Sequence, residues 1–375
     1  MNINAMYNEL FENYIEIKPD DDLATVTLAI PAGAGVCLFV ADNDKPVVFI
    51  YAASLRNLAR RRLDQQQARK ADLRSIIVKI YFCSCFSQFE TQLQYFKLAR
   101  KIYPDSYTEL MPRLDVWFLK LDNKKSVPSF SISRNYQNDC CWGPFPTKGP
   151  IGQLIEIVQQ LFGLCRNPAR LKSCSYGQMG LCVGLCLDKI SDDEYAKLFQ
   201  KAIDFLNDNP QHNIEYINEH ITQLSKELKF EQAGQMHQKL KALRKIYDMC
   251  YVGPVEKFWI IAFQPGPKIT IARNEETKTA RHKANSISTF IIGPGVIEQL
   301  APFTLNHADE NCKAVLDHLN LCKLQQNVAK TDEQLLGWLT NQLHKNDSDK
   351  GLFVVADEDL NTKTLAEKVN DYFQS

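Results

Sequence analysis

The chain has 375 residues, 45% hydrophobic and 23% charged, and its 44 basic and 44 acidic side chains cancel. This length and composition predict two or three domains of an ordinary soluble globular protein. Zero net charge excludes a molecule that binds DNA over its whole surface, and no apolar run approaches the roughly 18–20 residues of a membrane-spanning helix. The acidic N-terminus lacks a signal-peptide core. We therefore expect a cytoplasmic protein whose 12 cysteines are core residues or metal ligands.

The first third of the chain alternates apolar segments with helical patterns. A short helix is expected within residues 8–17. Segments rich in Val, Ile and Phe predict strands at residues 24–30, 35–42, 45–54, 75–86, 116–121 and 130–134. A basic helix is expected over residues 54–71, and a second helix over residues 88–104, closed by Pro104. We expect these elements to form a small mixed sheet flanked by helices.

Residues 56–74 form a basic stretch with seven Lys or Arg against two Asp. Such a stripe contacts phosphates without reading the base sequence. Its other interpretation is a solvated helix face with no ligand. The candidate DNA-binding residues are Arg56, Arg60, Arg62, Arg69, Lys70 and Arg74.

The order of the N-terminal elements resembles the GIY-YIG nuclease domain. Gly35-Val36-Cys37 stands at the G-[IV]-Y motif and Tyr51-Ala52-Ala53 at the Y-[IV]-G motif. Asn57-Leu58 with Arg60-Arg61-Arg62 stands at the N-L-x-x-R motif. The resemblance implies an active site in which tyrosines activate water, an arginine stabilises the phosphate charge and a glutamate holds one divalent metal.

The sequence departs from this family at most of the catalytic positions. Only Tyr51 and Arg61 match the family there. The first tyrosine, the lysine, the metal-binding glutamate and the asparagine are replaced by Cys37, Ser54, Tyr95 and Tyr107. Tyrosine is a poor ligand for Mg²⁺, which prefers carboxylate and water oxygens. Glu90 precedes Tyr95 by more than one helical turn, so it is a poor substitute. We expect a degenerate nuclease domain with no catalytic divalent metal, and whether the chain is an enzyme stays open.

Four cysteines follow in the middle of the chain, with the spacing C-x8-C-x7-C-x3-C. Thiolates are soft ligands that suit zinc or an iron–sulfur cluster. Structural zinc sites usually take their cysteines as two tight C-x2–4-C pairs, and one such pair is present here. Spacing alone therefore leaves open a metal site or four unrelated core cysteines. The candidate ligands are Cys165, Cys174, Cys182 and Cys186.

The surroundings of these cysteines resemble the middle region of UvrC, a component of the bacterial excinuclease of nucleotide excision repair. The resemblance is carried by GPFP at residues 143–146, by LFGLC at 161–165, and by SCSYGQMGLCVGLCLDKISDDEY at 173–195. It implies that the four cysteines hold a 4Fe–4S cluster, with zinc as the alternative. It also connects the GIY-YIG resemblance to this family, since UvrC carries such a domain at its N-terminus.

Residues 214–247 show apolar residues at helical spacing in two successive segments, which predicts an antiparallel helical hairpin. ELKFEQAGQMHQKLKAL resembles the UVR motif, and the resemblance implies docking on the matching hairpin of UvrB. Met236-His237-Gln238 replaces the usual L-R-D, so the partner contacts are expected to differ. A purely structural hairpin is the other interpretation. The candidate partner-binding residues are Phe230, Glu231 and Met236.

The remaining residues, 253–375, carry no motif. Apolar segments predict strands at residues 257–264, 268–274, 288–293 and 351–357, and helices at 309–324, 332–345 and 363–373. About 120 residues cannot hold both an RNase H-like nuclease and a helix-hairpin-helix pair, which follow the UVR motif in UvrC. No Walker motif occurs, so no nucleotide cofactor is expected.

We therefore expect a multi-domain α+β chain: an extension at 1–24, a degenerate GIY-YIG domain at 25–125, a 4Fe–4S region at 126–208, a UVR hairpin at 209–250 and an α+β domain of unknown role at 253–375. The expected function is a truncated UvrC-like repair protein that binds DNA and a UvrB-type partner without cutting. The alternatives are an active single-incision nuclease resembling Cho, and an iron–sulfur interaction protein with no DNA role.

Overall fold

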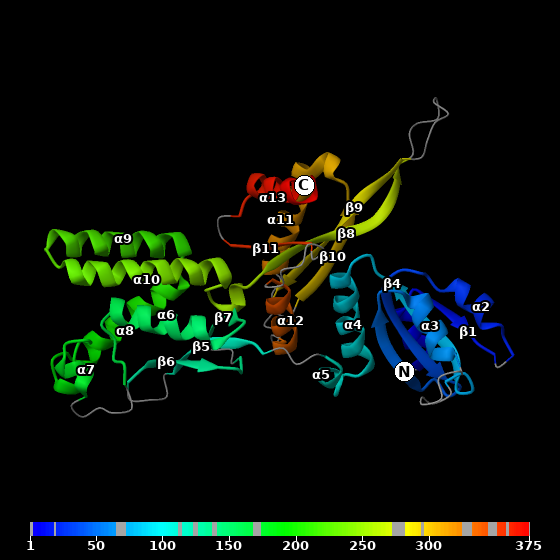
Figure 1. Ribbon diagram of the computed structural model, residues 1–375, viewed down its shortest axis with the longest axis horizontal. Helices are drawn as coiled ribbons and strands as arrows, with labels where there is room; N and C mark the ends of the chain where they lie inside the picture. The colour runs from blue at the N-terminus through cyan, green and yellow to red at the C-terminus, as the bar shows by residue number, and fades with distance from the viewer. Residues whose placement is uncertain are drawn as a thin grey trace.

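The structure is a computed structural model that describes residues 3–18, 20–64, 73–111, 115–122, 127–136, 141–167, 174–271, 282–293, 296–324, 332–343, 351–357 and 360–374, with backbone alone at 267–271 and 282–285. Three antiparallel sheets organise these residues. Figure 1 shows them in an elongated molecule, with the N-terminal sheet at one end, the paired helices α9 and α10 at the other, and the C-terminal sheet between them. Within the described residues, no helix is both long and apolar enough to cross a membrane.

The N-terminal sheet has the strand order β1-β4-β2-β3. The elements of this part are α1 (Ile3–Leu10), β1 (Asn13–Glu16), α2 (Leu23–Val26), η1 (Thr27–Ala29), β2 (Gly35–Ala41), β3 (Pro46–Ala52), α3 (Leu55–Leu63), β4 (Ile77–Ser84), α4 (Gln88–Ile102) and α5 (Tyr107–Leu110). All its strand pairs are antiparallel, so the expectation of a mixed sheet was wrong. The strand expected at residues 24–30 is also wrong, because the Asp22 side chain accepts the backbone N–H groups of Ala24 and Thr25 and starts a helix there.

The two faces of this sheet are covered by different helices. Cys37 packs on one face with Leu55 and Leu58 of α3. Its neighbour Val36 packs on the other face, in one core with Tyr95 of α4. Successive residues of a strand face opposite sides, and Val36 pairs with Tyr51 across β2 and β3. Tyr51 and the cysteine that replaces the first family tyrosine therefore lie on opposite faces.

The middle of the chain forms one continuous core, built from residues between Leu119 and Val252. Its elements are β5 (Trp117–Asp122), β6 (Ser129–Ser133), β7 (Cys141–Phe145), α6 (Lys148–Leu161), α7 (Ser175–Gln178), η2 (Leu185–Leu187), α8 (Asp192–Asn207), α9 (Pro210–Lys226) and α10 (Phe230–Met249). The sheet order is β6-β5-β7, so the strands expected near residues 116–134 do not join the N-terminal sheet. A capping box of Ser191 and Glu194 starts α8, and the predicted hairpin is present as α9 and α10.

The C-terminal sheet has the order β10-β9-β8-β11. Its elements are η3 (Val255–Lys257), β8 (Ile260–Ile271), β9 (His282–Gly293), β10 (Val296–Phe303), η4 (Leu305–His307), α11 (Ala308–Leu324), α12 (Glu333–Leu343), β11 (Leu352–Val355) and α13 (Thr362–Gln374). Helices α11 and α13 pack on one face, while α12 and α4 pack on the other. The two strands expected at 257–264 and 268–274 are a single strand, β8, and β10 was not predicted.

Helix α4 is shared between the N-terminal and C-terminal sheets. Phe89 on α4 stacks on Trp338 of α12 with ring centroids 4.9 Å apart. The Trp338 Nε1–H donates to the side-chain oxygen of Gln92 at 3.0 Å. Tyr95 and Leu98 on the same helix pack on the N-terminal sheet instead. Helix α4, which carries Tyr95, is therefore fixed on both sides by buried contacts.

Candidate functional site

The four cysteines of the middle region lie around the ends of short elements. Cys165 follows α6, Cys174 precedes α7, Cys182 precedes η2 and Cys186 lies within η2. Gly163 and Gly184 have φ values of +64° and +74°, which let the backbone reverse beside Cys165 and Cys186. The Val183 N–H donates to the Gly163 carbonyl at 2.9 Å, and this bond holds the Cys182 segment against the end of α6.

The structure brings these four thiols to one place. The sulfurs of Cys174 and Cys186 are 3.6 Å apart. Burial raises the pKa of the Cys165 thiol, and the negative charges that Cys182, Cys174 and Cys186 would carry raise it further. Such electrostatic influence requires proximity. Gly177 leaves room for this arrangement, since a Cβ at that position would lie 3.1 Å from the Cys186 sulfur.

Backbone and side-chain groups support the thiols. The pKa of Cys174 is lowered, first by the Gly177 N–H and then by Cys186, which favours the thiolate that metals bind. The Cys165 N–H donates to the hydroxyl of Tyr195 at 3.2 Å, so α8 is tied to the first cysteine. These contacts fix the backbone and side chains around Cys165 and Cys174.

The spread of the sulfurs bears on the kind of group that fits. Four thiolates on one zinc ion, each at about 2.3 Å, lie about 3.8 Å from one another. Within the described chain, three or more ligand atoms come within 4.8 Å of one another only at Glu298, His318 and Cys322. No three of the four sulfurs are that close to one another, although Cys174 and Cys186 have the spacing that one zinc ion requires.

The nuclease-like face is filled with aromatic side chains. Tyr95 stacks on Phe49 with centroids 4.4 Å apart and meets Tyr51 edge to face at 5.0 Å. Phe49 also contacts Tyr103 at 5.9 Å. Burial raises the pKa of Tyr95 to about 12, with smaller contributions from Tyr51 and Tyr103. Because its pKa is raised, Tyr95 is a neutral phenol. The nuclease resemblance implies a carboxylate at this position.

The other departures from the nuclease pattern have structural contacts of their own. Burial raises the pKa of Cys37 to about 12, so its thiol stays protonated. The Ser54 hydroxyl accepts the Asn57 N–H and caps α3. The Tyr107 hydroxyl donates to Asp332 at 2.9 Å, which ties α5 to the start of α12.

Glu90 lies in the first turn of α4, before Tyr95 in the middle of the same helix. Its carboxylate accepts the Phe86 N–H at 2.7 Å and the side-chain amide of Gln299 at 3.2 Å. Burial raises its pKa, although these hydrogen bonds oppose the shift. Glu90 therefore stabilises the start of α4 and its contact with β10, and it does not replace a metal ligand near Tyr51.

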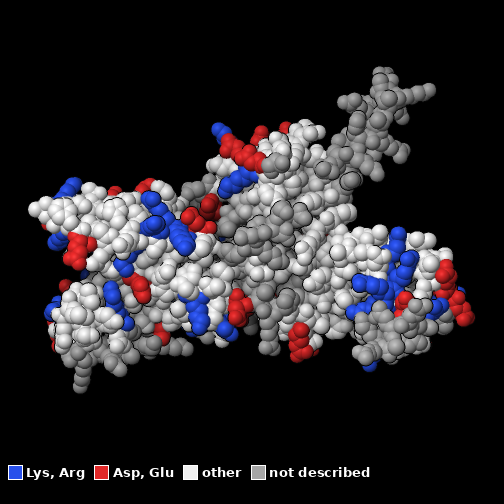
Figure 2. All heavy atoms as spheres, viewed as in Figure 1, with Lys and Arg blue, Asp and Glu red and all other residues white. Residues whose placement is uncertain are grey.

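The basic stretch divides into structural and exposed arginines. Arg56 donates to the carbonyls of Ile30 and Leu28, and Arg74 donates to the Asp21 carbonyl at 2.7 Å. These two side chains hold the segment before β2, which argues against their expected role as DNA contacts. Arg60 and Arg61 are exposed and Arg62 is half-buried on α3, while Arg69 and Lys70 lie outside the described residues. Figure 2 shows basic side chains gathered on the N-terminal unit, with acidic side chains at its outer edge.

The two remnants of the catalytic set belong to different elements. Tyr51 lies near the end of β3 and is 39% exposed. Arg61 lies on α3, and its Nε–H donates to the Asn57 carbonyl of the preceding turn. Both side chains remain accessible to solvent, but the sheet face that Tyr51 shares with Tyr95 is not the face that α3 covers.

The turn of the hairpin exposes apolar side chains. Leu228, with φ of +58°, is 74% exposed, and Phe230 is 65% exposed. Glu231 is exposed beside them. Met236 is 4% exposed and packs in the seam between the helices. The expectation that Met236 contacts a partner was therefore wrong: its place in the apolar repeat makes it a core residue.

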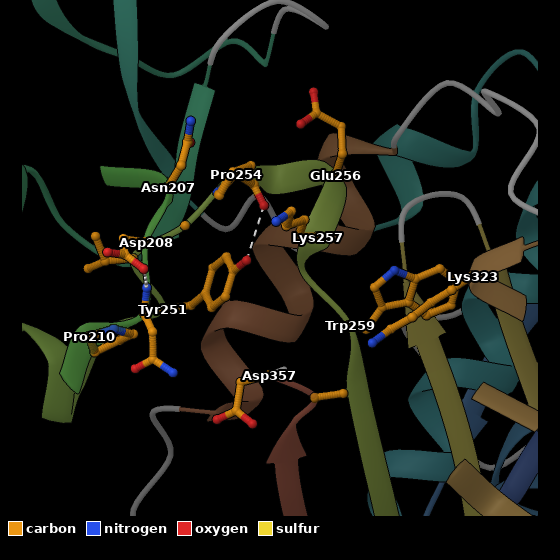
Figure 3. A pocket seen from close by; sticks show the side chains of 14 residues that line it. Asn207, Asp208, Pro210, Tyr251, Pro254, Glu256, Lys257, Trp259, Lys323 and Asp357 are labelled. Atoms are coloured by element: carbon orange, nitrogen blue, oxygen red, sulfur yellow. Dashed lines mark hydrogen bonds between the residues drawn. The ribbon is translucent and has the colours of Figure 1, made fainter. Parts of the chain in front are cut away.

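A cavity of about 350 Å³ was not indicated by any sequence pattern. It is lined mainly by the junction of α8 with α9 and by residues 251–259, together with Lys323 and Asp357. Figure 3 shows Tyr251 in this cavity, where its hydroxyl donates to the Pro254 carbonyl at 3.1 Å. The lining comes from segments far apart in the chain, so only the fold reveals it.

Comparisons with known proteins agree on one family. The model of the UvrC/Cho excinuclease middle domain matches residues 116–205. UvrABC system protein C of Clostridium novyi is 27% identical over 231 residues, which cover 58% of this chain and 37% of that protein. The protein of the same name from Lactobacillus delbrueckii subsp. bulgaricus is 24% identical over 246 residues, covering 65% and 39%. No solved structure matches the chain.

The matched residues form the first part of the continuous middle core, which extends to Val252. The family match begins at residue 116, before the boundary expected at residue 126, and includes the β6-β5-β7 sheet together with all four cysteines. UvrABC system protein C of Histophilus somni is 31% identical over 117 residues, which cover 30% of this chain and 19% of that protein. The chain spans about two fifths of the length of the first curated relatives it matches. Residues 116–205 therefore match the UvrC/Cho middle domain, and about three fifths of the chain is similar to UvrABC system protein C.

Proposed function

We propose that this chain is a nucleotide excision repair protein that binds DNA and a UvrB-type partner but does not cut the DNA. The matched family supports an excision-repair role in general. The finer parts of the proposal rest on the degenerate nuclease face, the four cysteines, the exposed arginines of α3 and the turn of the hairpin.

The packing of Tyr95 is the main observation that supports a loss of DNA cleavage. A one-metal nuclease needs a carboxylate at this position to hold the ion beside the scissile phosphate. Here the position holds a phenol that is 8% exposed, stacked on Phe49 and in contact with Tyr51. The Glu90 carboxylate is engaged at the start of the helix by the Phe86 N–H and the Gln299 side chain. Binding without chemistry is the role that remains for this face.

The four cysteines support a 4Fe–4S cluster held by Cys165, Cys174, Cys182 and Cys186. When bound, such a cluster would link the end of α6 to the segment before α8 and add its binding free energy to folding. The chain itself prepares the site: Gly177 gives space beside Cys186, and Tyr195 accepts the Cys165 N–H. We infer a structural role for the cluster in holding the middle core, which also carries the hairpin.

The hairpin supports docking on a partner hairpin. Leu228 and Phe230 are apolar, exposed and adjacent at the turn, where no other described element covers them. Exposed aromatic side chains of this kind commonly act as interface anchors. Glu231, one residue further, supplies a charge at the rim of the same surface. The seam of the hairpin packs on α6, so the turn is presented by a rigid support.

DNA binding is proposed through the exposed arginines of α3. Arg60, Arg61 and Arg62 follow one another, so on a helix they spread over more than half a turn and contact phosphates on different sides. Such contacts release counterions and make binding salt-dependent.

Binding of a lesion-bearing duplex, followed by fluorescence anisotropy with and without a UvrB-type protein, tests the proposal. We expect affinity that falls steeply with salt and rises when the partner is present. Binding of the partner without any affinity for DNA would support the alternative of an interaction protein with no DNA role. Absence of both interactions would overturn the proposed function.

A further inference from the structure

Three metal-ligand side chains meet in the C-terminal domain, outside the regions discussed so far. Glu298 lies on β10, and His318 and Cys322 lie on α11. Their ligand atoms all lie within 4.8 Å of one another. The Glu298 Oε2 is 2.5 Å from the His318 Nε2. These residues are far from the four-cysteine site in the sequence and belong to a different hydrophobic core.

The fold explains why they converge. His318 and Cys322 are separated by four residues, so they share one face of the helix and stand one turn apart. That helix packs against the sheet through Val315, Leu319 and Cys322, which directs this face towards the strands. Glu298 lies in the middle of the edge strand β10 and pairs with Ile291, which packs on the sheet face that α11 covers.

The three side chains of this cluster differ in their exposure to solvent. Cys322 is 5% exposed, so its sulfur is held in the core. The side chains of His318 and Glu298 are 37% and 43% exposed, so an ion can reach them from solvent. Lys97 of α4 lies near enough to Glu298 to interact electrostatically. The cluster therefore lies where α11 packs against the edge strand β10.

We propose that Glu298, His318 and Cys322 bind a zinc ion. One imidazole nitrogen, one thiolate sulfur and one carboxylate oxygen form a donor set that zinc accepts. Zinc–ligand bonds of about 2.0–2.3 Å require ligand atoms about 3–4 Å apart, within the spread seen here. Three protein ligands leave a fourth position for water. A bound ion would replace the direct Glu298–His318 contact and fasten α11 to β10.

The competing explanation is a surface ion pair of His318 with Glu298 beside a buried core cysteine. Zinc stoichiometry of the full chain, measured by native mass spectrometry after zinc addition and buffer exchange, separates the two. His318→Ala and Glu298→Gln are compared with the wild type, with the four-cysteine site intact in all. His307→Ala is the matched control, because His307 is an exposed histidine that contacts Glu310 just before the same helix.

We expect both site variants to retain one zinc fewer per chain than the wild type and the His307→Ala control. Added zinc should raise the Tm of the wild type and the control above that of each site variant, because an ion that binds the folded state stabilises it. Glu298→Gln keeps a half-exposed amide and tests the site even where His318→Ala impairs folding. Equal zinc content and equal Tm shifts in wild type and Glu298→Gln would overturn the proposal.

Discussion

The rings of Tyr51 and Tyr95 meet edge to face with centroids 5.0 Å apart, one from the end of β3 and the other from the middle of α4. The family resemblance places these two residues in one catalytic centre, and the fold does bring them together. What lies between them is an aromatic contact that continues to Phe49. The contact between these two residues is therefore part of an aromatic cluster on one face of the N-terminal sheet.

Replacement of Tyr95 tests whether its ring or its hydroxyl matters. Tyr95→Ala should lower the free energy of unfolding by about 3–5 kcal/mol, the cost typical of deleting a buried aromatic side chain. Tyr95→Phe keeps the ring and should cost less than about 1 kcal/mol. Urea unfolding measures both. An equal loss in the two variants would mean that the hydroxyl is the important group, which a packing role does not explain.

The hairpin gives a matched pair of variants. Phe230→Ala should weaken binding to a UvrB-type hairpin by about 2 kcal/mol, or about 30-fold, with unchanged helical content, because Phe230 is exposed. Met236→Ala should instead lower stability by about 2–5 kcal/mol, because Met236 is buried. Calorimetric titration and circular dichroism separate the two effects. Unchanged partner binding by Phe230→Ala would favour a purely structural hairpin.

The arginines of α3 and of the segments around it should respond differently to substitution. Double replacement Arg60→Glu and Arg61→Glu should reduce affinity for duplex DNA and flatten its dependence on salt by about 0.9 in log–log slope per lost phosphate contact. Arg56→Ala should mainly reduce stability, since it removes hydrogen bonds to the Ile30 and Leu28 carbonyls. DNA affinity measured over a series of salt concentrations shows whether the arginines of α3 contact phosphates. An unaltered salt slope in the double variant would identify α3 as a solvated face.

Removal of one thiol should destroy the proposed cluster. Cys186→Ser removes a sulfur that lies 3.6 Å from Cys174. The anaerobically purified variant should lose its brown colour and its bound iron and sulfide, and should be less stable, because ligation contributes to folding. Cys312→Ala, a buried cysteine on α11, serves as the control and should keep the cluster. A wild-type protein that is colourless and carries one equivalent of zinc at these cysteines would contradict the iron assignment.

Local patterns predicted much of the fold where they coincide with tertiary packing. The helical spacing of apolar residues predicted the hairpin, and most of those residues pack in the seam between α9 and α10. The pattern at residues 24–30 failed because the apolar alternation there is overridden by the Asp22 cap. Strand β1 was missed because it gains its structure from pairing with β4, and its own residues are mostly exposed.

The sites were predictable where a motif fixes them and not where the fold assembles them. The spacing and surroundings of the four cysteines indicated a common site. Nothing in the sequence connected Glu298 with His318, because only the packing of α11 on β10 joins them. Met236 was placed on the surface because the resemblance emphasised its motif position, although its apolar spacing indicated the core. Strand β7 was missed because it contains Pro144, which is tolerated because β7 lies at the edge of its sheet.

The central claim is that the chain binds DNA without cutting it, and incision of a lesion-bearing duplex tests it most directly. The purified protein is incubated with the duplex, Mg²⁺ or Mn²⁺, and UvrA- and UvrB-type partners, with a full-length UvrC as the positive control. Each loss of about 1.4 kcal/mol of transition-state stabilisation lowers the rate about tenfold. Loss of a metal ligand typically removes several kcal/mol of this stabilisation. We expect no nick while DNA binding persists. A specific nick that Arg61→Ala abolishes would contradict the account and show an active nuclease.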